Sequence, residues 1–344
     1  MAAMEVDGDP SDRVKLRDVA SVAHVSVSTV SKVLNGRSGV SKDTRLRIEA
    51  LLSEGKYNRR ASSQVGSRLV EVLCFEIDSP FASEVISSIE RVAGERGVGI
   101  VLTGATAQHV PPNNWTETVL ARWPVGVILV ASQLPTEDRH RLQSHDIPIV
   151  MVDPSGAPAA DVPSIGSADW NGGFLATNHL IELGHVAIAI ITGPDDMLAS
   201  TARLSGYRAA LDAAGIPVLP EWVRPGQFHH ADGVVEGRAV LALDPRPTAV
   251  FASSDLQALG VYEAARSLGL DIPGDLSVIG YDDLKIAKWA GPPLTTIRVP
   301  LVEMAEQATR LVMRLRDEPE LAFSRVDLAT SLVVRGSTAR PGRR

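Results

Sequence analysis

The sequence has one cysteine, few aromatic residues and no long hydrophobic run. Cys74 is alone among 344 residues, so a disulfide within the chain is excluded, and the surrounding run LVEVLCF predicts a thiol buried in a strand. No apolar stretch reaches the roughly 18 residues of a membrane span. The acidic N-terminus, MAAMEVDGDPSD, lacks the apolar segment of a secretory signal. These absences predict a soluble, cytoplasmic protein.

Charge is distributed unevenly along the chain. The net charge of −7 taken alone argues against a nucleic-acid partner. Residues 13–60, however, contain eleven lysines or arginines and four acidic residues, a net charge of +7, whereas residues 1–12 carry −4 and the remainder −10. A small basic module on a large acidic body is typical of a DNA-binding head. The alternative is a solvated, charged face on an ordinary helical subdomain.

Residues 16–35, LRDVASVAHVSVSTVSKVLN, predict two short helices joined by a tight turn. The first helix has an apolar stripe at i, i+3, i+4 and i+7, formed by Leu16, Val19, Ala20 and Ala23. His24 lies at the turn, where a positive φ is often needed and histidine tolerates it. The second helix opens at the potential N-cap Ser26 and turns its apolar face inward, with Val30, Val33 and Leu34. Small or polar groups on its other face can reach bases and phosphates.

The segments around this motif differ in composition. Residues 1–12 are predicted to be a disordered tail, and residues 13–57 a helix-turn-helix DNA-binding domain. A third helix is expected from the N-cap candidate Ser41 to about Glu54, where Gly55 ends it. Residues 58–68, NRRASSQVGSR, are small and polar, which predicts a hinge or linker.

Residues 69–338 alternate between strand and helix patterns. Near-continuous apolar runs, typical of strands buried on both faces of a parallel sheet, occupy residues 69–77, 98–104, 126–132, 147–153, 186–193, 248–255 and 276–283. Helical patterns lie between them at residues 81–97, 174–184, 205–215 and 256–269. The alternation predicts a doubly wound α/β body with two parallel sheets, split near residues 160–170. A hydrophobic content of 44% is enough for sizeable cores, although aromatic residues contribute 4%.

Polar residues stand at the predicted carboxyl ends of these strands. Open α/β sheets bind ligands beyond that edge. The pattern therefore predicts one polar cleft, lined by Asp78, Ser79, Asp153, Ser254, Asp255 and Asp282.

Five motifs in order along residues 14–338 resemble the lactose-repressor (LacI/GalR) family of transcription regulators. They are DVASVAHVSVSTVSKVLNG, VSKDTRLRI, RLSGYRAAL, SSDLQALG and LSVIGYDD, and PPLTTIRVP closes the series. The resemblance implies a DNA-binding head, a hinge and a body folded like periplasmic sugar-binding proteins. It also implies three crossings between the subdomains, with the third near residues 296–300. Such proteins act as homodimers or tetramers on nearly palindromic operators, and the lack of an obvious heptad tail after Ser337 favours a dimer.

The resemblance places the base-reading residues at Val27, Ser28 and Lys32. Lys32 can donate to guanine O6 or N7, whereas Val27 can contact a thymine methyl group. Phosphate contacts, which set register and salt dependence, are implied for Ser26, Thr29, Ser31, Asn35, Ser41 and Thr44, with Arg17 and Lys15 adding to them. Helix capping is an equal explanation for Ser41 and Thr44.

The hinge departs from the family pattern Y-x-P-N-x-x-A-x-x-L. Arg59 replaces the proline, Arg60 the asparagine, and Gly66 the leucine that wedges into the minor groove. Glycine weakens a helix by about 1 kcal/mol and has no side chain to insert between base steps. We therefore expect a hinge that does not kink DNA in the family manner, with Arg59 and Arg60 following the backbone or a narrow minor groove.

The resemblance places the effector between the subdomains. The matched positions are Asp78, Phe81, Asp153, Arg203, Phe228, Ser254, Asp255 and Asp282. Carboxylates and arginine satisfy sugar hydroxyls, and an aromatic ring packs on the C–H face of the sugar. An ion pair without a ligand is the alternative for Asp282 and Arg203, and core packing is the alternative for Phe228. Ser254 stands where the family has asparagine.

No cofactor or metal is expected. His229 and His230, with Asp232 close in sequence, could suggest a metal, but adjacent histidines in a loop without a third ligand at metal-site spacing are typically solvated. The sequence has no phosphate-binding GxxxxGK[ST] loop, no glycine fingerprint after a strand and no GxSxG elbow, which argues against an enzyme. The leading hypothesis is a repressor of carbohydrate-utilisation genes controlled by a small sugar. A free sugar-binding protein and an enzyme acting on the bound sugar are the alternatives.

Overall fold

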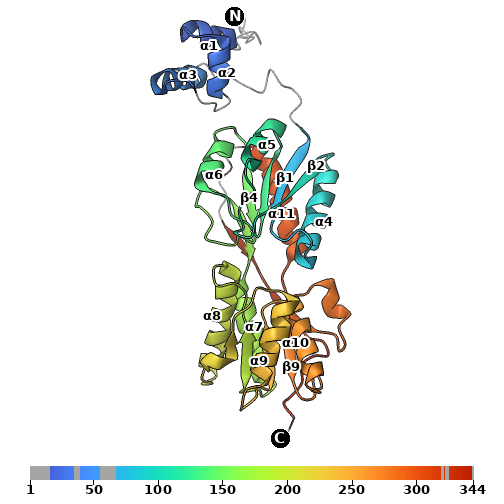
Figure 1. The fold of residues 1–344 in the computed structure, drawn as a ribbon. Coiled ribbons are helices and arrows are strands. Elements are labelled where there is room, and N and C mark those ends of the chain that lie inside the picture. Colours follow the sequence, from blue (N-terminus) through green and yellow to red (C-terminus); the bar gives the residue numbers. More distant parts are fainter. Residues whose placement is uncertain (1–15, 35–38, 55–66, 319–320, 322–324, 343–344) are drawn as a thin grey trace, which may run out of the picture. The chain divides into compact units, whose positions relative to one another are not determined.

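The computed structural model describes residues 16–34, 39–54, 67–318, 321 and 325–342, and the chain divides into two compact units, residues 1–66 and 67–344 (Figure 1). In the described part of the first unit the chain forms α1 (Leu16–Val22), α2 (Val27–Leu34) and α3 (Lys42–Glu54). The predicted third helix is thus confirmed in its bounds. The tail, Gly55 and most of the hinge lie outside the described residues.

The three helices of the first unit share a small aliphatic core. It consists of Val19, Ala20, Ala23, Val30, Val33 and Ile48. The predicted turn is confirmed, because His24 has a φ of 54°. Ser26 caps α2, since its Oγ accepts the Thr29 N–H at 3.1 Å. The side chains of Leu16 and Leu34 lie outside the described part of the chain.

The second unit contains two lobes, each built on a six-stranded sheet. In the first lobe the strand order is β11-β5-β4-β3-β1-β2, and in the second it is β12-β10-β9-β8-β6-β7. Neighbouring strands are parallel except for the antiparallel pair β10 and β12. The first sheet comprises β1 (Leu69–Cys74), β2 (Gly99–Gly104), β3 (Gly126–Val130), β4 (Ile149–Val152), β5 (Ser164–Ser167) and β11 (Val326–Leu328); the second comprises β6 (Ile188–Ile191), β7 (Val223–Arg224), β8 (Ala249–Ala252), β9 (Ser277–Asp282), β10 (Thr295–Arg298) and β12 (Ser331–Val333).

Helices cover both faces of each sheet (Figure 1). Alternate residues of one strand enter different cores: Val72 packs in the cluster with α4 and α11, and Leu73 packs in the cluster with α5 and α6. Both faces are therefore apolar, which explains the continuous hydrophobic runs. The first lobe carries α4 (Pro80–Gly94), α5 (Trp115–Arg122), α6 (Thr136–Gln143) and α11 (Leu301–Asp317); the second carries α7 (Asp169–Glu182), α8 (Leu198–Ala213), α9 (His230–Leu241) and α10 (Asp255–Ser267), with short 3₁₀ turns at Pro220–Trp222 and Lys285–Lys288.

Three segments cross between the lobes. The chain passes from β5 to α7, returns from β10 to α11, and crosses again from β11 to β12. The first crossing falls within the predicted split at residues 160–170. The crossing near residues 296–300 is the second rather than the third, which corrects our expectation. The third crossing runs through short strands with only three residues each, and such strands give little sequence signal.

All seven predicted apolar runs contain a strand, and the four predicted helical segments overlap α4, α7, α8 and α10. The doubly wound fold class is therefore confirmed. Cys74 is buried at the end of β1, as predicted. Among the described residues, no helix is long and apolar enough to cross a membrane.

Candidate functional site

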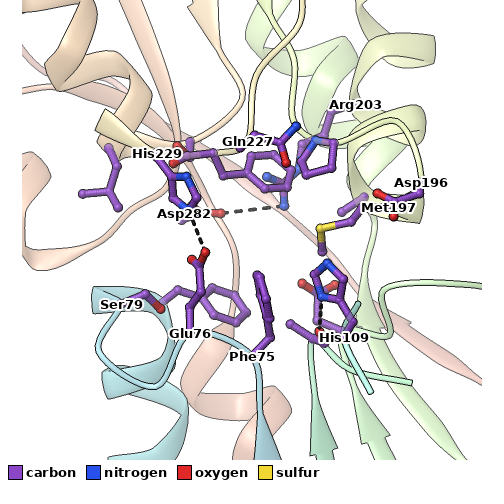
Figure 2. Close-up of a pocket in the computed structure, with 18 of the residues that line it drawn as sticks. Phe75, Glu76, Ser79, His109, Asp196, Met197, Arg203, Gln227, His229 and Asp282 are labelled. Carbon is purple, nitrogen blue, oxygen red and sulfur yellow. Dashed lines mark hydrogen bonds and ion pairs between the residues drawn. The ribbon is translucent and has the colours of Figure 1, made fainter. Parts of the chain in front are cut away.

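A pocket of about 190 Å³ lies between the two lobes of the second unit. Its walls come from loops at the carboxyl ends of strands in both sheets, as expected for open α/β sheets. Figure 2 shows Phe75, Glu76 and His109 facing Arg203, Gln227 and His229 across this space.

Many residues of the pocket wall occupy the left-handed region of backbone space. The positive φ values belong to Glu76 (47°), His109 (60°), Ala131 (46°), Asp153 (48°), Phe228 (66°) and Asp282 (106°). Non-glycine residues in sparsely populated regions cost on the order of 1–3 kcal/mol each and cluster at functional sites. Tight backbone turns at the strand ends therefore direct these residues toward the pocket. The packing of the surrounding fold offsets the free-energy cost of the positive φ values.

Arg203, on α8, is the buried cation of the pocket. Its Nε donates to Asp169 Oδ1 at 2.8 Å, its Nη1 donates to the Ser253 carbonyl at 2.7 Å, and its Nη2 lies 3.7 Å from Asp282 Oδ1. The guanidinium also stacks 3.8 Å from the centre of the Tyr281 ring. The ion pair that was the alternative for Asp282 and Arg203 is therefore present, and both residues also line the pocket.

Carboxylates outnumber cations in this buried cluster. Burial, together with the nearby Asp169 carboxylate, raises the pKa of Asp153 above its usual value, although Arg203 opposes the rise. Burial likewise raises the Asp282 pKa well above the usual range. For Arg203, burial disfavours the charge, but Asp169, Tyr281 and Asp282 raise its pKa. One arginine thus stabilises several acids that water would otherwise solvate.

Aromatic rings form the apolar walls. The Phe75 and His109 rings lie 3.9 Å apart in a tilted arrangement, and His109 Nδ1 lies 3.0 Å from the Ala131 carbonyl oxygen. Phe81 and Phe228 complete the wall. A Cβ at Gly193 would collide with the Phe228 ring, so the absent side chain makes room for this ring.

Ser254 holds part of the pocket in place. Its Oγ donates to the Phe228 carbonyl at 2.7 Å and accepts the Gln257 N–H at 3.1 Å, so it caps α10 and fixes the Phe228 loop. This arrangement uses the hydroxyl that replaces the family asparagine.

The structure brings together most of the predicted effector residues and separates two of them. Phe81, Asp153, Arg203, Phe228, Ser254 and Asp282 line the pocket, as does Ser79. Asp78 is exposed and outside the lining, because β1 ends at Cys74 and the chain turns at Glu76 before it reaches Asp78. Asp255 is fully buried beneath the pocket, where it accepts hydrogen bonds from the Leu284 N–H and the Thr296 hydroxyl. The expectation that both line the cleft is corrected.

Sequence reasoning missed several lining residues. They are Phe75, Glu76, His109, Asp196, Met197, Gln227, His229 and Leu284. Phe75 and Glu76 lie at the end of the apolar run predicted as a strand at residues 69–77, beyond the observed end of β1 at Cys74, and that position was the available signal. His109 and Met197 lie in loops with no periodic pattern to mark them.

The face of α2 that the sequence predicts to read DNA is exposed to solvent. Val27, Ser28 and Lys32 are exposed, opposite the buried Val30 and Val33. Thr29, Ser31 and Thr44 are partly exposed, and Ser26 is exposed. Ser41 caps α3, since its Oγ accepts the Thr44 N–H at 3.3 Å. Arg17's side chain and the residues Lys15, Asn35, Arg59, Arg60 and Gly66 lie outside the described part.

The histidine pair near the pocket has separate partners. His229 Nε2 lies 2.6 Å from Glu76 Oε1, and His230 Nε2 lies 3.7 Å from Glu263 Oε2. Asp232 accepts the backbone N–H groups of Gln227 and His229. Within the described ranges, no group of three or more histidine, cysteine or acidic side chains is arranged to hold a metal ion.

Each of the two units contains a region that matches a known protein family. Residues 15–59 match the family described as bacterial regulatory proteins, lacI family, and residues 177–338 match the periplasmic binding protein-like domain. The ribose operon repressor of Escherichia coli (strain K12) is 35% identical over 328 residues, which cover 94% of this chain and 99% of that protein.

Among the solved structures that resemble the chain over almost its whole length are two regulators in complex with small molecules. The complex of the transcriptional regulator CelR with cellobiose is 32% identical, with a TM-score of 0.71, covering 94% of this chain and 100% of that one. The lac repressor dimer bound to operator and the anti-inducer ONPF is 27% identical, with a TM-score of 0.69, covering 95% and 99%.

The two family matches show a protein with a helix-turn-helix head and a periplasmic-binding-protein-like body. The chain belongs to the LacI family of bacterial regulatory proteins. It is a DNA-binding transcriptional regulator, and its relatives are repressors rather than enzymes.

Proposed function

We propose that this protein represses carbohydrate-utilisation genes and that a small, uncharged sugar bound between the lobes sets its operator affinity. The observation that carries the proposal is the pocket at the junction of the lobes, bounded by phenylalanine faces and acidic side chains. A ligand there touches both lobes, so it can favour one arrangement of them over another. The relatives named for a ribose operon and for a cellobiose complex support a sugar.

The aromatic content of the pocket suits the apolar face of a sugar ring. Phe75, Phe81 and Phe228 are three of the six phenylalanines in a chain with few aromatic residues. Such rings pack against the C–H groups of a sugar. Nearby carboxylates accept hydrogen bonds from its hydroxyls, and Arg203 donates hydrogen bonds to them.

The charge of the pocket favours an uncharged ligand over a phosphorylated one. Glu76, Asp153, Asp196 and Asp282 line it, whereas Arg203 is the one lining arginine or lysine among the described residues. Arg203 already donates to Asp169 and the Ser253 carbonyl and lies beside Asp282, so its positive charge is compensated within the protein. A phosphate would also lie close to several carboxylates, and like charges in a buried site repel strongly.

The size of the pocket favours a monosaccharide. Its volume of about 190 Å³ lies below the roughly 300–1,000 Å³ of clefts that hold drug-sized ligands. We therefore place a pentose or hexose ahead of a disaccharide as the effector.

The DNA-binding role is assigned to residues 13–57, and the effector and dimerisation role to residues 69–338, joined by the hinge 58–68. The exposed Val27, Ser28 and Lys32 support base contacts from α2, with the flanking Ser26, Thr29, Ser31 and Thr44 on phosphates. Ser41 caps α3 in addition to any phosphate contact. Arg17, Asn35, Arg59 and Arg60 complete the proposed set.

A homodimer on a nearly palindromic operator fits this assignment. The lac repressor is a dimer on its operator in the structure that resembles this chain. Two heads related by a two-fold axis require two half-sites related in the same way. A protein that acts on chromosomal DNA resides in the cytoplasm.

A nuclease footprint upstream of the protein's own gene tests the proposal. The full-length protein is incubated with that DNA alone and with D-ribose, D-glucose, cellobiose or D-ribose 5-phosphate. A symmetric protected site that responds to one uncharged monosaccharide is the expected result. A response to D-ribose 5-phosphate alone contradicts the uncharged effector, and a site unaffected by every sugar contradicts sugar control.

A further inference from the structure

A polar contact joins the two lobes across the mouth of the pocket. Glu76 follows β1 in the first lobe, and His229 precedes α9 in the second. Figure 2 shows their side chains meeting, and Glu76 Oε1 lies 2.6 Å from His229 Nε2. Neither residue belongs to the three crossing segments, so the contact adds a connection that the backbone does not supply.

Both partners are held by their own lobe before they meet. Glu76 sits in a tight turn with a φ of 47°, and its carbonyl accepts the Ser79 N–H at 2.9 Å. On the other side, Asp232 Oδ2 accepts the N–H groups of Gln227 at 2.6 Å and His229 at 3.1 Å, which fixes the start of α9. Each side chain is thus presented to the cleft from an ordered loop, and moving the lobes apart breaks the contact.

A second, backbone contact joins the lobes elsewhere. The Leu198 N–H, at the start of α8, donates to the Ser155 carbonyl of the first lobe at 2.9 Å. This bond joins two backbone groups and contains no ionisable side chain. The two lobes are thus in contact through a backbone hydrogen bond as well as through the side chains of Glu76 and His229.

We propose that Glu76 and His229 form a clasp that holds the lobes closed over the effector and that loosens when a rise in pH removes the proton from His229. The proposal rests on the proposed function for the identity of what the clasp encloses, but closure itself is measurable without any effector. Histidine side chains change charge between pH 5 and 8. A protonated His229 makes a charge-assisted hydrogen bond to the Glu76 carboxylate, and such bonds are stronger than neutral ones.

The charged surroundings of His229 are mainly acidic. Glu76 faces it from the first lobe, and Asp232 approaches its backbone from α9. The other charged or titratable groups of the same pocket are His109, Asp153, Asp196, Arg203 and Asp282. The neighbouring His230 contacts Glu263 on α10, within the second lobe.

Lobe closure can be followed in full-length protein with two dyes. Glu137→Cys on α6 and Val235→Cys on α9 place exposed thiols on different lobes. The native Cys74 is buried and takes up no dye. Doubly labelled chains diluted into excess unlabelled chains give single-molecule energy transfer within one protomer, recorded without sugar at pH 6.0 and pH 8.5.

The clasp predicts a change in the ratio of closed to open molecules. Between pH 6.0 and 8.5 this ratio falls by about two- to fivefold, the range of a partly exposed ion pair. Glu76→Gln and His229→Gln lower it at pH 6.0 by a similar factor and remove the part of the pH dependence that the clasp contributes, whereas Asp153 is unchanged in every variant. Both replacements retain a hydrogen-bonding side chain, and His229→Gln retains the backbone N–H that Asp232 accepts.

His230→Gln is the matched control, because it removes an equally exposed histidine whose partner lies in the same lobe. It leaves both the ratio and its pH dependence unchanged. The clasp is refuted if Glu76→Gln and His229→Gln behave like His230→Gln, or if the wild-type ratio is the same at both pH values. Failure of every sugar to bind, with the clasp response intact, counts against the proposed function and not against the clasp.

Discussion

Among the described residues that line the cleft, acidic side chains outnumber arginine and lysine side chains. Arg203 is 4% exposed, and its three nitrogens face Asp169, the Ser253 carbonyl and Asp282. Burying charges costs several kcal/mol per ion, and this cost is offset only when the partners remain in place. The pocket is therefore sensitive to the loss of this one side chain.

Arg203→Met is expected to lower the free energy of unfolding of the body by about 3–5 kcal/mol, because it leaves buried carboxylates unpaired. Urea denaturation at pH 7 measures the change. The matched control is Arg238→Met on the exposed side of α9, which should change it by no more than about 0.5 kcal/mol. Equal effects of the two substitutions would contradict the assigned role of Arg203.

Because of Asp255, we expect the free energy of unfolding to depend on pH, independently of the clasp. Burial raises its pKa to about 7, even though hydrogen bonds from Thr296 and Leu284 oppose the rise. The ordinary pKa of aspartate is about 3.9, so the folded protein binds this proton more tightly than the unfolded chain. The stabilisation is fully present below about pH 4 and is lost as the pH rises through about 7.

We therefore expect the free energy of unfolding to fall between pH 6 and pH 8, with Asp255 contributing at most about 1.4 kcal/mol per pH unit. Asp255→Asn should flatten this slope, whatever its effect on stability at one pH. Urea titrations at pH 6, 7 and 8 measure the slope for both proteins. A variant with the wild-type slope would show that Asp255 does not carry this proton.

At the scale of elements, glycines allow two pairs of helices in the second lobe to approach closely. A Cβ at Gly173 on α7 would collide with the Arg203 backbone on α8, and a Cβ at Gly206 would collide with the Trp170 carbonyl. Gly233 on α9 and Gly260 on α10 repeat the arrangement against each other's helix. Because α8 carries Arg203 and α9 begins beside His229, these contacts position the pocket.

Gly233→Ala should destabilise the body by about 1–3 kcal/mol, as overpacking does in a closely packed interior. Gly94→Ala on α4 is the control, because a Cβ there meets only a flexible glutamate side chain at 3.8 Å. Thermal or urea unfolding compares the two variants. If both alanines are tolerated equally, the close approach of α9 and α10 does not contribute as inferred.

At the scale of the whole molecule, charge is divided between parts with different partners. Residues 13–60 are strongly basic, and the rest of the chain is acidic. A basic module gains affinity for any DNA through release of counterions, which falls steeply with salt, whereas base contacts distinguish one sequence from another. The body, being acidic, contributes little to non-specific binding.

Lys32→Ala is expected to weaken binding to the operator by about 1–3 kcal/mol, the typical value of a good base contact, and to relax the preference at one base pair. Arg47→Ala removes the same charge from an exposed position on α3 and should leave the sequence preference unchanged. Fluorescence anisotropy with operator and scrambled DNA over a range of salt separates the two effects. Equal losses on both DNAs for Lys32→Ala would assign Lys32 to a phosphate.

The local sequence was sufficient to predict most helices and strands and some residues of the pocket. Continuous apolar runs predicted the central strands because both sheet faces are buried. The stripe of small aliphatic residues and the capping Ser26 predicted the head. The resemblance to a known family located Asp153, Arg203 and Asp282 in the pocket.

Only the tertiary structure decided which neighbours meet across the cleft. Glu76 and His229 are 153 residues apart, and the packing of two sheets brings them to 2.6 Å. Asp78 and Asp255 carry the same carboxylate as Asp153, yet a backbone turn leaves one in solvent and the start of α10 directs the other into the core. Composition and periodicity predict whether a segment is a helix or a strand and which of its faces is buried. Contacts between distant loops depend instead on how these elements pack together.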